Sequence, residues 1–217
     1  MEIGTLIREL GGGMWISAEI FILTLLFSLP LGLVVAFGRM SKIAPVRWIS
    51  KLYISIKRGT PLMLQLMVVY FGPYYLFGMR ISTGYRMTAV LIGFAINYAA
   101  YFAEIYRGGI EAIPVGQYEA AKALGMTYPQ TMRRIVIPQM IRNVLPPISN
   151  ETINLVKDTS LIYILAMNDL LRVARTIVQR EFDMTPFVIA AVFYLVMTFV
   201  LTWIFKKLEA HYAKYDQ

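Results

Sequence analysis

Five long apolar runs, separated by polar segments, dominate the pattern of this sequence. They cover about residues 14–38, 60–76, 87–106, 147–167 and 186–205. A helix of about 20 apolar residues, rising about 1.5 Å per residue, crosses the hydrocarbon core of a bilayer. The pattern therefore predicts an all-α membrane protein with five transmembrane helices, organised as a single domain over residues 1–217.

The fourth apolar run differs from the others in its charge. It contains Glu151, Lys157 and Asp158, whereas the other four runs are nearly free of charged residues. Charged side chains are costly in lipid, so we expect the fourth span to face protein or a water-filled path.

The composition agrees with a lipid environment. Hydrophobic residues make up 58% of the chain and charged residues only 16%, and the mean hydropathy is +0.58, values outside the usual range of soluble domains. The chain has no cysteine, which excludes disulfides, thiol catalysis and cysteine-based zinc sites. The single histidine, His211, lies in the polar tail, so we expect a solvated side chain and no metal site.

The charges of the polar connections predict the orientation. Residues 39–58 contain no acidic residue and six basic ones, namely Arg39, Lys42, Arg47, Lys51, Lys57 and Arg58. Short connections rich in Lys and Arg stay in the cytoplasm, so the N-terminus is expected outside and the C-terminus inside. The net charge of +8 then reflects membrane topology, and no nucleic-acid partner is expected, because the basic residues lie between apolar runs.

Residues 169–183 form a shorter segment with a different pattern. Leu170, Leu171, Ala174, Ile177 and Val178 recur near helical spacing among charged residues. This periodicity predicts an amphipathic helix at the outer surface. It is compatible with a plain interfacial helix and equally with a helix that contacts a partner.

The connection after the third span, residues 107–146, is long and internally organised. Residues 116–124 favour a short helix that Gly125 terminates, and Thr127 with Pro129 signals the start of a second helix. We therefore predict a helical hairpin at the cytoplasmic face. A partner that grips a rigid hairpin can move the attached spans as one body.

The same connection resembles a known signature. Glu119-Ala120-Ala121, then Gly125 six residues after the glutamate, then Ile135-Val136-Ile137-Pro138 is similar to the EAA motif of bacterial ABC importer permeases, with Ile137 where Leu is usual. Further stretches, 57–62, 97–109 and 157–160, resemble the polar amino-acid permeases of the histidine, arginine and glutamine type. The simpler alternative for the motif is an ordinary helix in which Glu119 pairs with Lys122.

The resemblance implies a type I ABC importer permease fold and a set of roles. Glu119, Ala120, Ala121, Gly125 and Pro138 would form the coupling element that docks on a cytoplasmic ATPase. The implied partners are two ATPase subunits, a second permease chain that is identical or homologous, and an extracytoplasmic amino-acid-binding protein. The implied location is the bacterial cytoplasmic membrane, with several spans.

Catalytic signatures are missing from the sequence. It contains no Gly-x-x-x-x-Gly-Lys-Ser/Thr loop and no Ser-His-Asp set. We therefore expect a transporter subunit that is not an enzyme and holds no cofactor, with ATP and magnesium bound by the partner ATPases. Its expected function is to form the path for polar L-amino acids, with basic ones as a candidate class.

Two polar stripes in the spans are candidates for that path. Asn97 and Glu104 share a face of the third span with Tyr101, and Glu151, Asn154 and Asp158 share a face of the fourth, where Lys157 adds a donor. Ionisable groups inside a membrane mark either a path or an internal pair. In the second interpretation, Lys157 neutralises Asp158 or Glu151, and Glu104 pairs with Arg107.

Two other function classes remain open at this point. One is a secondary transporter, which usually shows two repeat halves with broken helices, unlike five unequal spans. The other is a scaffolding membrane subunit, which would not require charged residues in the fourth span.

Overall fold

The computed structural model describes residues 3–80 and 82–213, and the regular secondary structure of these residues is helical. Nine α-helices occur in this part of the chain: α1 (Ile3–Met40), α2 (Ala44–Gly59), α3 (Leu62–Phe77), α4 (Thr83–Glu111), α5 (Val115–Ala123), α6 (Tyr128–Thr131), α7 (Ile137–Asp158), α8 (Leu170–Glu181) and α9 (Thr185–Ala213). A π-helical turn, η1 (Met132–Val136), precedes α7, and a 3₁₀ helix, η2 (Thr159–Leu165), follows it.

The long helices lie where the apolar runs predict them. Within the described residues, three helices are long and apolar enough to cross a membrane: Ile3–Met40, Gly84–Glu111 and Thr185–Tyr212. Leu62–Phe77 is apolar but shorter, and α7 carries the charged residues of the fourth run, whose remainder forms η2. The all-helical architecture is thus confirmed, while the count of five spans stays a prediction.

Helix α2 was not anticipated, since residues 39–58 were interpreted only as a basic connection. Its apolar residues are spaced for one helical face, but the segment is too short and too charged to register as a span. In the structure Tyr53 and Ile54 pack against Ala36, Ala100 and Ala103 of α1 and α4. This contact with two other helices stabilises a segment whose own sequence is ambiguous.

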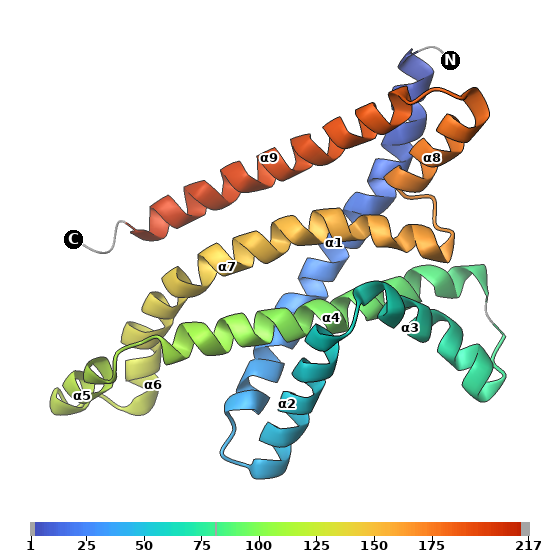
Figure 1. The fold of residues 1–217 in the computed structure, drawn as a ribbon. Helices are drawn as coiled ribbons and strands as arrows, with labels where there is room; N and C mark the ends of the chain where they lie inside the picture. Colours follow the sequence, from blue (N-terminus) through green and yellow to red (C-terminus); the bar gives the residue numbers. More distant parts are fainter. Residues whose placement is uncertain (1–2, 81, 214–217) are drawn as a thin grey trace.

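The crossing of α1 and α4 forms the centre of the packing (Figure 1). A Cβ atom on Gly32 would lie 2.8 Å from Cβ of Phe102 and 3.1 Å from the carbonyl oxygen of Ala99. Only glycine permits this approach of the two backbones, the kind of contact that small residues allow between membrane helices. Phe94, Phe102 and Leu155 fill the core beside it.

The two ends of the molecule carry different elements. Figure 1 shows the N-terminal end of α1 and helix α8 together at one end, and α5, α6 and the C-terminal end of α9 at the other. Helix α7 connects these ends and packs against both α4 and α9. The predicted coupling hairpin and the predicted surface helix therefore lie far apart.

The predicted amphipathic helix of residues 169–183 is confirmed as α8, which buries Leu170, Ala174 and Ile177. Asp169 caps it by accepting hydrogen bonds from the backbone amides of Leu171, at 3.1 Å, and Arg172, at 3.2 Å. Burial raises the pKa of the Asp169 carboxyl to about 6. The buried face of α8 packs against α1 and α9.

Because α8 packs closely on α1, alanine at two adjacent glycines of α1 should affect stability very differently. A Cβ on Gly13 would lie 2.9 Å from the Asp169 carbonyl oxygen, whereas one on Gly12 would meet nothing within 4 Å. Gly13→Ala should lower the unfolding free energy in detergent by roughly 1–3 kcal/mol, the usual effect of overpacking. Gly12→Ala is the control and should leave the unfolding free energy unchanged or raise it. Equal thermal unfolding curves for the two variants would contradict this packing.

Candidate functional site

A polar cavity of about 560 Å³ lies beside α4 and α7 and is open to the outside of the chain, where Asn154 and Lys157 are exposed. Five of the six predicted path residues line it, namely Asn97, Glu151, Asn154, Lys157 and Asp158. The other walls come from Thr60, Pro61 and Leu62 at the break between α2 and α3, from Tyr98 and Tyr101 of α4, and from Leu161 of η2. The structure thus brings together the polar stripes of the third and fourth predicted spans, and we call this space the central cavity.

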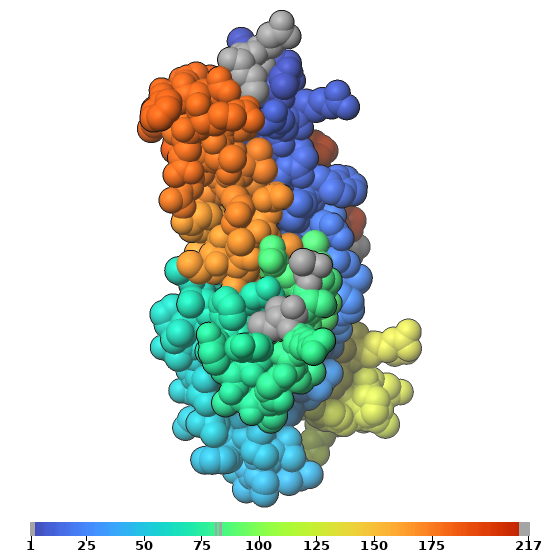
Figure 2. Space-filling model, turned by 90° about the vertical axis from the view of Figure 1, so that its right-hand side faces the viewer, coloured from blue at the N-terminus to red at the C-terminus, as the bar shows by residue number. Residues whose placement is uncertain are grey.

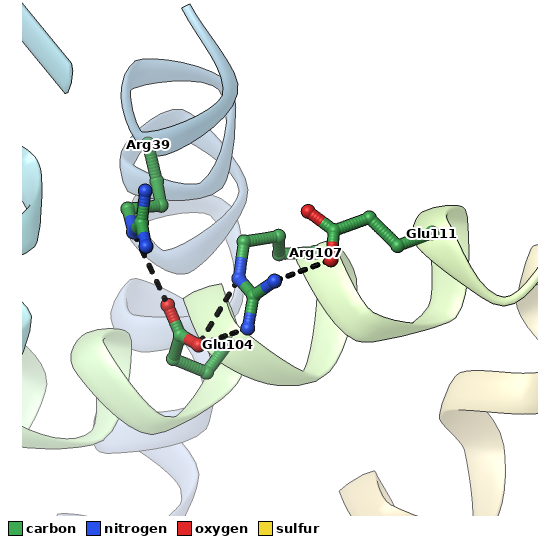
Figure 3. Close-up of polar contacts among 4 residues, drawn as sticks. All are labelled: Arg39, Glu104, Arg107 and Glu111. Atoms are coloured by element: carbon green, nitrogen blue, oxygen red, sulfur yellow. Dashed lines mark hydrogen bonds and ion pairs between the residues drawn. The ribbon is translucent and has the colours of Figure 1, made fainter.

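Glu104, the sixth predicted path residue, is not among the residues that line the central cavity. Its carboxylate lies 2.6 Å from Nη2 of Arg107 and 3.8 Å from Nε of Arg39, as Figure 3 shows. Arg107 also pairs with Glu111, one turn further along α4. The structure therefore has the Glu104–Arg107 pair that was the alternative interpretation, and the further contact of Glu104 with Arg39 joins the end of α1 to α4.

Asn97 is buried and holds the break between α2 and α3. Its Nδ2 donates to the Lys57 carbonyl oxygen and to Oε1 of Gln65, both at 3.1 Å. Gln65 in turn donates from Nε2 to the carbonyl oxygens of Lys57, at 2.9 Å, and Thr60, at 3.1 Å. Both amide hydrogens of Asn97 are thus used by the protein, and the bonds satisfy backbone carbonyls that the helix break leaves open.

Sequence reasoning missed Gln65, although a lone glutamine within an apolar run is a signal of this kind. It also missed Tyr98, whose hydroxyl donates to Oδ2 of Asp158 at 2.7 Å. The alternative interpretation paired Lys157 with Asp158 or Glu151, but across residues 3–80 and 82–213 the structure records no ion pair for Lys157. The lysine therefore remains available on the wall of the central cavity.

The central cavity presents both kinds of hydrogen-bonding group. Glu151 and Asp158 supply carboxylate acceptors, and Lys157 supplies an ammonium donor. The guanidinium carbon of Arg58 lies 5.3 Å from the ring centroid of Tyr101, which places a further cation beside the wall. Such a mixed lining suits a small zwitterion better than an apolar solute. Within the described residues, no group of His, Cys, Asp and Glu side chains could hold a metal ion.

The predicted helical hairpin is present at the opposite end from α8. Gly125 adopts a left-handed conformation with φ of 70° and ends α5. Its amide donates to the Lys122 carbonyl at 3.0 Å, and that of Met126 donates to the Ala121 carbonyl at 3.0 Å, which forms a Schellman cap. Thr127 starts α6 by donating its amide to Oε1 of Gln130 at 2.8 Å. The turn is therefore set by local hydrogen bonds.

The residues of the signature differ in exposure. Glu119 and Ala120 are exposed, Ala121 is buried, and Pro138 lies in the first turn of α7. Gln139 Nε2 donates to Oε1 of Gln117 at 3.3 Å, a brace between α7 and α5 that sequence reasoning did not anticipate. The hairpin thus presents an exposed acidic and small-residue surface on a braced base.

Comparison with known proteins shows the family to which this chain belongs. Residues 28–214 match the family described as binding-protein-dependent transport system inner membrane component. The chain belongs to this family, and its location in the inner membrane follows from that membership.

Individual relatives narrow the resemblance. The chain is 44% identical over 186 residues to the probable amino-acid ABC transporter permease YckA of Bacillus subtilis (strain 168), covering 85% of this chain and 80% of that protein. It is 37% identical over 198 residues to the arginine transport system permease ArtQ of the same organism, covering 91% and 89%. The predicted resemblance to amino-acid importer permeases is confirmed, and these relatives are transporter subunits rather than enzymes.

Solved structures agree with this fold. A crystal structure of an amino acid ABC transporter with histidines superposes with a TM-score of 0.86 at 34% identity, covering 97% of this chain and 99% of that one. An inward-facing MetNI methionine transporter has a TM-score of 0.76 at 16% identity, covering 98% and 99%, and shares the fold. The predicted all-α type I importer permease fold is confirmed at this level.

The ion network of Figure 3 predicts unequal effects for two glutamates. The Glu104 side chain is 18% exposed and has two arginine partners, whereas Glu111 is 56% exposed and has one. Glu104→Gln should lower the unfolding free energy in detergent by roughly 1–3 kcal/mol, because it removes the partner of Arg39 and one of the two partners of Arg107. The control Glu111→Gln should cost less than about 0.5 kcal/mol. A loss for Glu111→Gln as large as that for Glu104→Gln would show that the network does not hold α1 to α4.

Proposed function

We propose that this chain forms the translocation path for polar L-amino acids in an ATP-driven importer. The observation that carries the proposal is the central cavity, which brings two carboxylates and one ammonium of the fourth predicted span together with polar groups of α4. Charged groups within membrane spans almost always face the interior of the bundle or a water-filled cavity. Asn97, Glu151, Asn154, Lys157 and Asp158 are the candidate contacts, whereas we assign Glu104, the sixth residue predicted for the path, to the ion network with Arg39 and Arg107.

The orientation with five spans, N-terminus outside and C-terminus inside, is part of the proposal. It is supported by the distribution of charge, because the basic connection of residues 39–58 should stay in the cytoplasm with the hairpin. The hairpin of α5 and α6 lies at one end of the molecule and α8 at the other (Figure 1). In this orientation the hairpin faces the cytoplasm and α8 faces outward.

The proposed energy source is a pair of separate ATPase subunits that bind ATP and magnesium. No phosphate-binding loop occurs in the sequence, and the exposed Glu119 and Ala120 on the braced hairpin offer a docking surface. A second permease chain, identical or homologous, is expected as well. Only 6% of the most apolar stretch of α9 is buried against the rest of the chain. Lipid or a second chain must therefore cover the remainder.

The substrate class is supported by relatives and by charge. Relatives in Bacillus subtilis include an arginine permease and an L-cystine permease. In the cavity of this chain, the carboxylates of Glu151 and Asp158 offer acceptors for a cationic side chain, beside the cations Lys157 and Arg58. An extracytoplasmic binding protein would deliver it. Neither a secondary transporter nor a scaffold agrees with the family to which the chain belongs.

Co-purification tests the assembly. The chain extracted in mild detergent should carry two ATPase subunits, and the complex should hydrolyse ATP faster when an amino-acid-loaded binding protein is added. Isolation of a stable chain without an ATPase, from membranes that contain one, would refute the proposal and favour a scaffold or an ATP-independent carrier.

Two substitutions in the hairpin test coupling. Gly125→Pro cannot adopt the positive φ of this position, and Glu119→Lys reverses an exposed charge. Both variants should reach the membrane, but uptake should fall by about tenfold or more, equivalent to roughly 1.4 kcal/mol of docking free energy. Gly116→Ala, with no atom within 4 Å of the new Cβ, is the matched control. Normal uptake and normal stimulation of ATP hydrolysis in either hairpin variant would remove the coupling role.

Glutamate-to-glutamine substitutions at two sites test the path. Glu151→Gln should raise KM for a cationic amino acid roughly tenfold, because a hydrogen bond to a charged group contributes about 1.5–3 kcal/mol, with a smaller change for a neutral one. Glu104→Gln lies outside the cavity lining and should alter stability without altering KM. Unchanged KM for every amino acid in a well-assembled Glu151→Gln complex would exclude this carboxylate from the site.

A further inference from the structure

The 3₁₀ helix η2 is the wall between two polar cavities. Leu161 lines the central cavity, whereas Tyr163 and Ile164, on the next turn, line a second cavity of about 310 Å³. Its remaining walls are Ala166 and the α8 residues Arg172, Arg175, Thr176 and Gln179. We call this second space the outer socket, because it lies at the α8 end, opposite the hairpin.

The outer socket is cationic. Two arginines line it and no carboxylate does. In the described part of the chain, neither Arg172 nor Arg175 forms an ion pair. The nearby carboxylate of Asp169 interacts electrostatically with Arg172, but it is fully buried and accepts its hydrogen bonds from the first turn of α8. The socket therefore offers guanidinium donors to an anion from outside the chain.

Of the two arginines in the socket, Arg175 is in contact with η2. The guanidinium carbon of Arg175 lies 5.1 Å from the ring centroid of Tyr163, and its Nη1 donates to the Tyr163 hydroxyl. Nη1 of Arg86, from α4, donates to the carbonyl oxygen of Ala166 at 3.1 Å. The end of η2 is thus attached to both α8 and α4.

We propose that the outer socket receives a carboxylate side chain of the extracytoplasmic binding protein. The proposal rests on the function and orientation proposed above, which place α8 on the outside. Planar guanidinium groups match carboxylates in paired hydrogen bonds, and arginine is prominent at protein interfaces. The family is described as binding-protein-dependent, so such a partner must dock on the outward end. Figure 2 views the molecule from this side, with α8 forming one edge of the face.

A free amino acid fits the socket less well than a protein carboxylate. Its α-ammonium group would have to lie among arginines, and the lining has no carboxylate to accept it. The central cavity, by contrast, offers acceptors and a donor together. The charge of the two cavities therefore assigns the zwitterion to the central cavity and a lone carboxylate to the outer socket.

Docking of the binding protein at the outer socket would also affect η2, the wall between the two cavities. A carboxylate that engages Arg175 competes with its contacts to Tyr163, which fasten η2 to α8. Leu161, two residues before Tyr163, borders the central cavity. Short 3₁₀ segments adjoining long helices are frequent hinges, so the contact is placed to loosen the outer wall of the cavity when the binding protein arrives.

The test uses the complete complex of permease and ATPase in lipid vesicles, with the purified binding protein that stimulates the wild-type complex. Arg172→Gln and Arg175→Gln should each raise the binding-protein concentration for half-maximal ATP hydrolysis by roughly tenfold, the equivalent of one charged contact. For Arg172→Gln, which leaves the Tyr163 contacts intact, the maximal rate at saturation should be retained. Both variants should show a weaker dependence on salt. Arg180→Gln removes the same charge from α8 outside the socket and should behave as wild type.

The outcomes separate the two proposals. A wild-type complex that no amino-acid-binding protein stimulates would defeat the proposed function itself. A stimulated wild type with unchanged half-maximal concentration and salt dependence in Arg172→Gln would overturn the socket alone, whatever Arg175→Gln does. An equal rise of the half-maximal concentration in Arg180→Gln would also overturn the socket, since the overall positive charge of α8 would then explain the effect. Weaker binding of free amino acid to the purified Arg172→Gln complex, with an unchanged half-maximal concentration of binding protein, would assign the socket to the solute instead.

Discussion

The close approach of α1 to α4 is the contact on which the other features depend. At Gly32 the backbones are too near for any side chain beyond hydrogen. Lipid provides no hydrophobic drive for helices to associate, so tight packing of small residues has to stabilise the pair. The same approach brings Arg39 within reach of Glu104 and gives α2 a surface of alanines on which to pack.

Polar groups inside this bundle follow from a second constraint, the need to satisfy hydrogen bonds away from water. Asn97 and Gln65 bind the carbonyls exposed by the break between α2 and α3, and Tyr98 binds Asp158. The central cavity lies directly beside these bonds. The residues that shape the cavity are thus partly structural, and a variant at Asn97 would report on folding as much as on solute binding.

Helices α4 and α7 connect the parts that matter for transport. α4 holds the end of η2 through Arg86 near its start, lines the cavity in its middle, and leads into the hairpin beyond Glu111. α7 runs from the base of the hairpin to the cavity and continues into η2. Motion of either end can reach the cavity through continuous helix, since a rigid helix transmits displacement along its axis.

Local chemistry in the sequence determined the helical class, the amphipathic helix α8 and the hairpin with its turn at Gly125. It also determined five of the residues that line the central cavity. These follow from apolar run length, periodicity and turn residues, which act over a few positions. Only the tertiary structure decided that Asn97 binds Gln65, that Asp158 is paired with Tyr98, that Glu104 belongs to an ion network and that Arg172 and Arg175 share a socket with Tyr163. Each depends on which segments distant in sequence meet, and the packing of α1, α4, α7 and α8 sets those meetings.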